Sequence, residues 1–112
     1  MSKSRTITEI VERRGRAGWA VHPGEVLKHE FLRPLNVSGY ALAKAVGVTP
    51  QRVSDILLKK TGVSAEMAVL LARFLSTTPE FWMNLQSAYE LAIAQKAMRK
   101  RVEKIRPQGE AA

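Results

Sequence analysis

The stretch that decides the fold is Val37–Leu57, VSGYALAKAVGVTPQRVSDIL, which reads as two short helices joined by a tight turn. Ser38 can cap the first helix, because a serine hydroxyl accepts a hydrogen bond from a free backbone N–H of the first turn. Gly47 stands where that helix must stop, and glycine adopts the left-handed conformation without a Cβ penalty. Thr49 and Pro50 then supply a cap and a first helical residue for the second helix. This order of caps and breaks predicts a helix-turn-helix.

Apolar residues in both helices are spaced so that they face one interior. The predicted buried positions are Leu42, Ala43, Val46, Val53, Ile56 and Leu57. The side chains left outside on the second helix are Gln51, Arg52, Ser54 and Asp55. Glutamine pairs with adenine, arginine with guanine, aspartate accepts from cytosine and serine is adaptable, so this face can read bases in a major groove. The alternative is an ordinary helical hairpin with a solvated outer face.

The composition is that of a small basic protein. The chain has 112 residues, no cysteine and a net charge of +8, which indicates one domain plus tails with a surface that attracts polyanions. Without cysteine it forms no disulfide framework, thiolate metal site or thiol nucleophile. No apolar run has the length of a signal peptide core or a membrane span, so we expect no membrane partner and a soluble cytoplasmic protein associated with the nucleoid.

Much of the excess positive charge lies towards the ends of the chain. Residues 1–21 are predicted to form a mobile basic arm, which enters a minor groove, meets a partner protein or remains a solvated tail. Residues 22–95 are expected to form the DNA-binding and dimerisation domain, and residues 96–112 a basic C-terminal extension.

The remaining helices are predicted from similar local signals. His22 and Pro23 start a first core helix, in which Leu27 and Phe31 point inward and Leu35 helps to close the end. Ser64 caps the next helix, which is apolar almost all round and should be the central core helix, and Thr78-Pro79-Glu80 repeats the cap signature and opens the last one. No strand-type alternation appears, so the predicted fold is all-α, a compact five-helix bundle.

Two further surfaces are predicted beside the reading face. Lys59 and Lys60 follow the second helix of the motif, close to where a phosphate backbone would run, although a solvated basic loop is the alternative. The last helix is more apolar than so small an interior requires, so we expect part of it to pack on a second copy. An intramolecular core contact is the alternative for Phe81, Trp82 and Leu85. A homodimer would place two recognition helices about one DNA turn apart on a palindromic operator.

Nothing in the sequence points to catalysis. His22 and His29 lack the neighbours that a metal site or a general base requires, and His22 is expected to be a cap or a packing residue. Asp55 is alone on a basic face. We therefore expect no enzyme activity, no metal and no cofactor.

Three segments together resemble a known family: HPGEVLKHEFLRPLNVS from His22, LAKAVGVTPQRVSDIL from Leu42, and TGVSAEMAVLLARFLSTTPEFWMNLQSAYEL from Thr61. They resemble the HigA-type (VapI-like) antitoxins of the XRE, or Cro/cI-like, helix-turn-helix superfamily, over roughly residues 22–95. The resemblance implies a lambda-repressor-like fold and a role in a type II toxin–antitoxin module. Such an antitoxin is a dimeric repressor of its own operon that also binds and neutralises a HigB-like ribonuclease toxin.

The resemblance also assigns roles to residues. It implies base reading by Gln51, Arg52, Ser54 and Asp55, phosphate contacts near Ser38, Thr49 and Lys60, and a dimer interface around Phe81, Trp82, Leu85 and Gln86. Two positions depart from the family pattern, since Leu58–Thr61 replaces an Asn-Gly-Lys-Arg-like turn and Ser76 replaces a helix-ending glycine. The alternatives are a stand-alone XRE-type transcriptional regulator without a toxin partner, and a protein-binding module that has lost DNA affinity.

Overall fold

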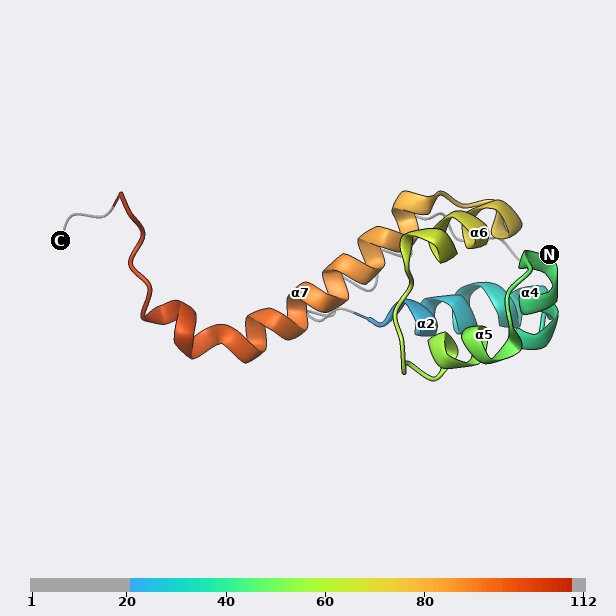
Figure 1. Cartoon of the computed structure of the whole chain (residues 1–112), viewed down its shortest axis with the longest axis horizontal. Helices are drawn as coiled ribbons and strands as arrows, with labels where there is room; N and C mark the ends of the chain where they lie inside the picture. The colour runs from blue at the N-terminus through green and yellow to red at the C-terminus, as the bar shows by residue number, and fades with distance from the viewer. Residues whose placement is uncertain (1–20, 110–112) are drawn as a thin grey trace.

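The computed structural model describes residues 21–109, and all regular structure in that range is helical (Figure 1). Its elements are α2 (Pro23–Val26), η1 (Leu27–Leu32), α3 (Arg33–Leu35), α4 (Gly39–Val46), α5 (Pro50–Leu57), α6 (Ala65–Leu75) and α7 (Pro79–Glu103). The first three follow one another without a break, so they form one helical rod and the bundle has the five predicted helices. The predicted basic arm, apart from Val21, lies outside the described residues.

The predicted helix caps are confirmed. The hydroxyl oxygens of Ser38, Thr49, Ser64 and Thr78 accept hydrogen bonds of 3.0–3.2 Å from the N–H groups of Ala41, Arg52, Met67 and Phe81. His22 caps α2, because its Nδ1 accepts a hydrogen bond of 2.9 Å from the N–H of Gly24. Gly47 ends α4 in the left-handed conformation, with φ of 78°. Local hydrogen bonding therefore fixes where these helices begin and where α4 ends.

The first rod widens in its middle. At the end of η1, the N–H of Arg33 reaches the carbonyl of Lys28, five residues back, which is the π-helical pattern. Pro34 follows directly, and a proline in a regular α-helix collides with the carbonyl four residues before it. The wider turn relieves that collision, so the rod continues through the proline to Asn36, whose φ of 57° ends it.

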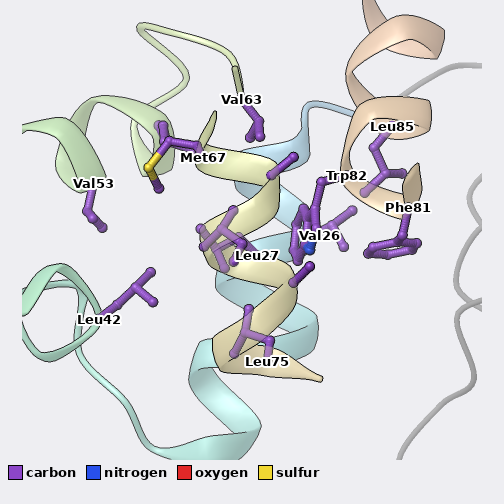
Figure 2. Close-up of a cluster of buried hydrophobic side chains, with 14 of the residues drawn as sticks. Val26, Leu27, Leu42, Val53, Val63, Met67, Leu75, Phe81, Trp82 and Leu85 are labelled. Atoms are coloured by element: carbon purple, nitrogen blue, oxygen red, sulfur yellow. The ribbon is translucent and has the colours of Figure 1, made fainter. Parts of the chain in front are cut away.

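The first rod, through α2 and η1, and each of the helices α4 to α7 contribute to one hydrophobic core (Figure 2). The core side chains include Val26, Leu27, Leu42, Val53, Met67 and Trp82, each at most 1% exposed. Trp82 has one polar atom, and its Nε1–H donates a hydrogen bond of 2.7 Å to Thr77 Oγ1. Because that donor is satisfied, the whole indole can be buried without an unpaired polar group.

Two expectations about burial need correction. The helix α6 supplies five buried side chains to the core, as expected of a central core helix, but its far side is open to solvent, because Val69 is 56% and Phe74 40% exposed. Leu35, expected to close the end of the first rod, is also 56% exposed. A small bundle covers only one side of each helix, so an apolar residue on the far side stays on the surface.

Close packing at two glycines holds α5 in place. A Cβ on Gly24 would overlap the carbonyl oxygen of Ile56, so α2 and α5 meet backbone to backbone. A Cβ on Gly39 would lie 3.1 Å from Leu57 Cδ1, so α4 also packs tightly on α5. Since Val53 and Ile56 are buried on this side, the opposite side of α5 faces outward.

Candidate nucleic-acid interface

The outward side of α5 carries the four predicted base-reading residues. Gln51 and Arg52 are exposed, and Ser54 and Asp55 are half-buried. Thr49 caps this helix and Pro50 occupies its first position, so the residue at which the helix begins is fixed, and with it the direction of the side chains in the first turn. In helix-turn-helix proteins the N-terminal residues of the recognition helix contact base edges, which is where Gln51 and Arg52 stand. Their role as base readers remains a prediction.

Gln51 and Asp55 are joined by a hydrogen bond. The Gln51 Nε2 donates to Asp55 Oδ1 at 2.7 Å, one helical turn further along. This contact fixes which way the glutamine amide points, because the nitrogen faces the carboxylate and the oxygen is left to accept. A free amide acceptor next to a carboxylate presents an acceptor-rich surface, which suits the exocyclic amino groups of adenine and cytosine in the major groove.

Arg52 is held by the next helix. Its Nη2 donates to Ser64 Oγ at 3.2 Å and lies 4.0 Å from Glu66 Oε1, both at the start of α6. Ser64 was predicted only as a cap, since a contact across twelve residues leaves no local pattern. A groove of about 410 Å³ lies between the two helix starts, and Thr49, Gln51 and Thr61 are among its lining residues. The arginine therefore lies along the wall of an open groove.

The predicted phosphate-contacting residues differ in whether their donor groups already have a partner within the chain. The Oγ atoms of Ser38 and Thr49 accept backbone N–H groups as caps, which leaves each hydroxyl hydrogen available to donate. Lys60 is exposed beyond the end of α5. Lys59 is engaged, because its Nζ lies 3.2 Å from Glu25 Oε2. A phosphate would have to compete with that carboxylate for the Lys59 ammonium.

Lys59 also takes the place of the missing glycine in the turn after α5. It adopts the left-handed conformation with φ of 64°, the backbone state that a turn glycine would adopt at no steric cost. The N–H of Lys60 then reaches the carbonyl of Asp55 at 2.8 Å, so the helix ends with a closed hydrogen-bonded turn. Ser76 does the same at the end of α6, with φ of 57°. Both departures from the family pattern thus keep the glycine-type geometry with a residue that has a side chain.

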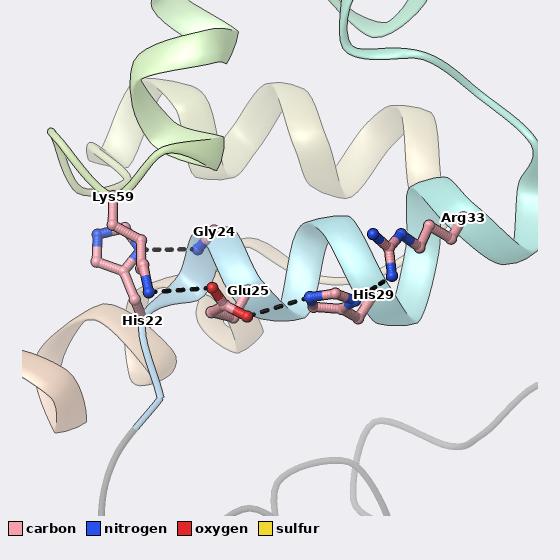
Figure 3. A network of polar contacts seen from close by, with 6 residues as sticks. All are labelled: His22, Gly24, Glu25, His29, Arg33 and Lys59. Atoms are coloured by element: carbon pink, nitrogen blue, oxygen red, sulfur yellow. Dashed lines mark hydrogen bonds and ion pairs between the residues drawn. The ribbon is translucent and has the colours of Figure 1, made fainter.

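A chain of polar contacts runs along the first rod and ends at Lys59 (Figure 3). Glu25 bridges Lys59 and His29, whose Nε2 lies 3.2 Å from Glu25 Oε1, and Arg33 Nη1 lies 3.0 Å from His29 Nδ1. A neutral His29 with its hydrogen on Nε2 satisfies both neighbours, since it donates to Glu25 and accepts from Arg33. The hydrogen bond with Lys59 lowers the pKa of the Glu25 carboxyl. The chain therefore positions Lys59 from the side of α2.

His22 lies beside this chain of contacts. Burial lowers the pKa of its imidazole below the ordinary value, and the positive charge of Lys59 adds to the effect. Its ring packs edge-on against Tyr89 of α7, with centroids 4.8 Å apart. His22 thus has both roles that were expected for it, since it caps α2 and packs in the interior.

The four residues expected at a dimer interface lie inside the single chain. Phe81, Trp82, Leu85 and Gln86 are 3%, 0%, 7% and 8% exposed. Phe31 packs on both aromatic rings of this group, with centroid distances of 6.0 and 5.3 Å. These side chains belong to the core of the monomer, which was the alternative for the first three, and in this arrangement they offer almost no surface to a second copy.

Gln86 has an intramolecular role that the sequence did not reveal. Its Oε1 accepts a hydrogen bond of 2.8 Å from the N–H of Val63, and its Nε2 donates to Glu90 Oε2 at 2.6 Å. The amide also packs so closely on Gly62 that a Cβ there would collide with it. Gln86 thus fastens α7 to the loop that leads from α5 into α6.

Residues 21–109 contain neither a candidate metal site nor a membrane-spanning helix. That range holds no group of three or more histidine, aspartate or glutamate side chains placed to bind a metal ion. None of its helices combines the length and the apolar character needed to cross a membrane.

Comparisons with known proteins agree with this geometry. A helix-turn-helix family model matches residues 29–82. Virulence-associated protein I of Dichelobacter nodosus is 40% identical over 77 residues, covering 69% of this chain and 71% of that protein. Antitoxin HigA-1 of Vibrio cholerae is 45% identical over 71 residues, 63% of this chain and 67% of that protein. A solved structure of Pseudomonas aeruginosa antitoxin HigA with the higBA promoter is 45% identical, with a TM-score of 0.76 over 79% of this chain and 97% of that one.

Proposed function

This chain belongs to the helix-turn-helix family that includes HigA-type antitoxins and virulence-associated protein I, and we propose that it is the antitoxin of a type II toxin–antitoxin module. In this role it represses its own operon as a dimer on a palindromic operator, and it binds and neutralises a HigB-like ribonuclease toxin. The observation that carries the proposal is the outward face of α5, where Gln51 and Arg52 stand at the first turn. The relative from Pseudomonas aeruginosa, solved with its promoter, supports DNA as the ligand.

Gln51, Arg52, Ser54 and Asp55 are proposed to read base edges, while Ser38, Thr49, Lys59 and Lys60 contact phosphates. The hydrogen bond between Gln51 and Asp55 supports this division, since it orients the amide before DNA arrives. Arg52 must leave Ser64 and Glu66 to reach a guanine. Because the arginine is 43% exposed and the ion-pair distance is 4.0 Å, that exchange costs little compared with a bidentate contact to a base.

The proposed dimer must use apolar side chains that the fold leaves exposed. On the folded domain, Val69 and Phe74 of α6 are such residues. A two-fold axis would set two copies of α5 about 34–36 Å apart, which matches successive major grooves on one face of DNA. Sedimentation of Phe74→Ser against the unchanged chain tests whether this face holds the copies together.

DNA binding is tested with the purified protein and fluorescent DNA from just upstream of its own gene. Fluorescence anisotropy is measured beside a scrambled duplex at two salt concentrations. A specific site should bind at least about a thousandfold tighter than the scramble. Equal, salt-sensitive binding to both duplexes would show that the positive charge binds polyanions in general, and it would contradict the repressor proposal.

Two variants distinguish a residue that reads a DNA base from one that contacts a phosphate. Arg52→Ala should cost on the order of 1–3 kcal/mol at the operator and relax specificity at one base pair. Lys60→Ala should weaken binding to all sequences alike and reduce the salt slope by about one unit. Arg73→Ala is the control, because Arg73 is an exposed arginine at the opposite end of α6 from Arg52. Identical behaviour of the first two variants on specific and random DNA would contradict the assignment.

The toxin is tested separately, by expressing the product of an adjacent small open reading frame with and without this chain. Rescue of growth and co-purification of the two proteins are expected. Growth arrest that this chain does not relieve would leave a stand-alone regulator as the function.

A further inference from the structure

The C-terminal half of α7 stands free of the bundle. The helix has 25 residues, about 37 Å at 1.5 Å per residue, and it projects well beyond the other helices (Figure 1). Its buried residues end at Gln86, and every residue from Ile93 to the end of the helix at Glu103 is exposed. A helical segment of this length without tertiary contacts is marginal in water, so a partner that packs on it would stabilise it.

An apolar seam runs along this free segment. Leu91, Ala94, Met98 and Val102 follow one another at spacings of three and four, and Ile105 continues the spacing just past the helix. At about 100° per residue these side chains fall within one narrow stripe. Met98 is 42% and Val102 58% exposed, so the stripe is open to solvent. Such a narrow 3-4 stripe is the geometry of a coiled-coil seam, which packs against another helix.

The charges around the seam are almost all positive. Residues 91–106 contain six bases, Lys96, Arg99, Lys100, Arg101, Lys104 and Arg106, and one acid, Glu103. Arg99 and Arg101 flank the seam on its two sides, at positions where coiled coils place the charges that select a partner. A second copy of this segment would bring like charges together across the contact, which is unfavourable. The N-terminal residues are a poor match too, since residues 1–20 carry five bases against two acids.

We propose that the C-terminal half of α7 is a docking site for an acidic amphipathic helix of another protein. The partner helix would bury its apolar stripe on Leu91, Met98 and Val102, and its carboxylates would lie beside Arg99 and Arg101. An anionic membrane surface fits less well, because interfacial helices have a broad apolar face with large aromatic residues. No aromatic residue follows Tyr89 in this chain. DNA phosphates would pair with the lysine and arginine side chains but would leave the apolar seam exposed to solvent.

The test uses the full chain and a synthetic helical peptide with leucines at 3-4 spacing flanked by glutamates. Binding is followed by anisotropy of the labelled peptide and by the gain in helicity. The acidic peptide should bind at least about tenfold tighter than a matched peptide with lysine flanks, because opposite charges flank the seam. The double change Met98→Ser with Val102→Ser should weaken binding at least about tenfold, since two apolar side chains no longer become buried.

Ile93→Ser is the matched control. Ile93 is 52% exposed on the same segment but points to the side opposite the seam, so its loss should leave binding within about twofold. All three substitutions lie outside the core, and melting of the bundle should be unchanged in each variant. Operator binding should be unchanged as well, which separates this inference from the DNA-binding proposal.

Several results would overturn the inference. If the Met98/Val102 variant bound the acidic peptide as tightly as the original chain, the contact would be one of charge alone. Binding to vesicles of phosphatidylglycerol that the same variant abolishes, with no binding of the peptide, would identify a membrane surface instead. Self-association that the same variant abolishes would identify a second copy as the partner.

Discussion

Replacing Gly24 by alanine tests how α5 is held. The added methyl group would overlap the backbone carbonyl oxygen of Ile56, at the point where α2 and α5 touch. A flexible side chain could rotate away from such a contact, but a carbonyl within a helix cannot. The two helices must separate instead, and the neighbouring contacts of Val26 and Val53, both almost fully buried, loosen with them.

The expected cost follows from two opposing effects. Overpacking a core by one methyl group typically costs about 1–3 kcal/mol, and a backbone neighbour places Gly24→Ala at or above the upper end. Alanine favours a helix over glycine by up to about 1 kcal/mol, which offsets part of this cost. The free energy of unfolding should therefore fall by about 2 kcal/mol. For a domain of this size that lowers the melting temperature by roughly 8–16 °C.

Urea denaturation followed by far-ultraviolet circular dichroism measures this difference. Gly109→Ala is the matched control, because a Cβ on Gly109 would meet no other atom within 4 Å. Operator affinity should fall with Gly24→Ala even where the variant is fully folded, since α5 moves. A free energy of unfolding within about 0.5 kcal/mol of the original would refute the claim that backbone contact at Gly24 positions α5.

Other consequences can be measured in the same way. Ser76→Gly should raise the free energy of unfolding by about 0.5–1 kcal/mol, because glycine adopts the φ of 57° without the steric cost that serine bears; an unchanged or lower value would contradict this. The lowered pKa of His22 means that the unfolded chain binds a proton more readily. Stability should therefore fall as the pH drops below about 6.5, and His22→Asn, which keeps an acceptor for the Gly24 N–H, should flatten that fall. Trp82→Ala should lower the free energy of unfolding by about 3–5 kcal/mol, measured by urea titration, and the loss should be the same at low and high protein concentration. A loss that grows with protein concentration would instead show that Trp82 contributes to a dimer interface.

Much of the helical framework could be predicted from local sequence. The caps at Ser38, Thr49 and Ser64 were predicted because capping depends on a side chain and N–H groups three residues away. The outward direction of Gln51 followed from the spacing of Val53 and Ile56, since a helix of known pitch fixes which side chains oppose an apolar face. These inferences needed no knowledge of where the other helices lie.

The dimer interface could not be predicted from local sequence. Periodicity indicated that one side of the last helix is apolar, but it does not say whether this chain or a second one covers that side. The aromatic ring of Phe31 occupies the space beside Phe81 and Trp82, so the question was decided by a residue some fifty positions earlier. The exposure of Val69 and Phe74 was not predicted for the same reason. Apolar residues lie on nearly all sides of α6, so periodicity does not show which side faces the core.

The sequence by itself determined the five helices, their caps and the identity of the side chains that α5 turns outward, because these depend on hydrogen bonds and angles within a few residues. Only the tertiary structure decided what those side chains touch. It placed Ser64 beside Arg52, Glu25 beside Lys59 and Gln86 beneath the α5–α6 loop. Such contacts join residues that are 12 to 34 positions apart, and they exist only because helix packing brings separate elements within hydrogen-bonding distance. Their energies depend on that packing and leave no repeat in the sequence.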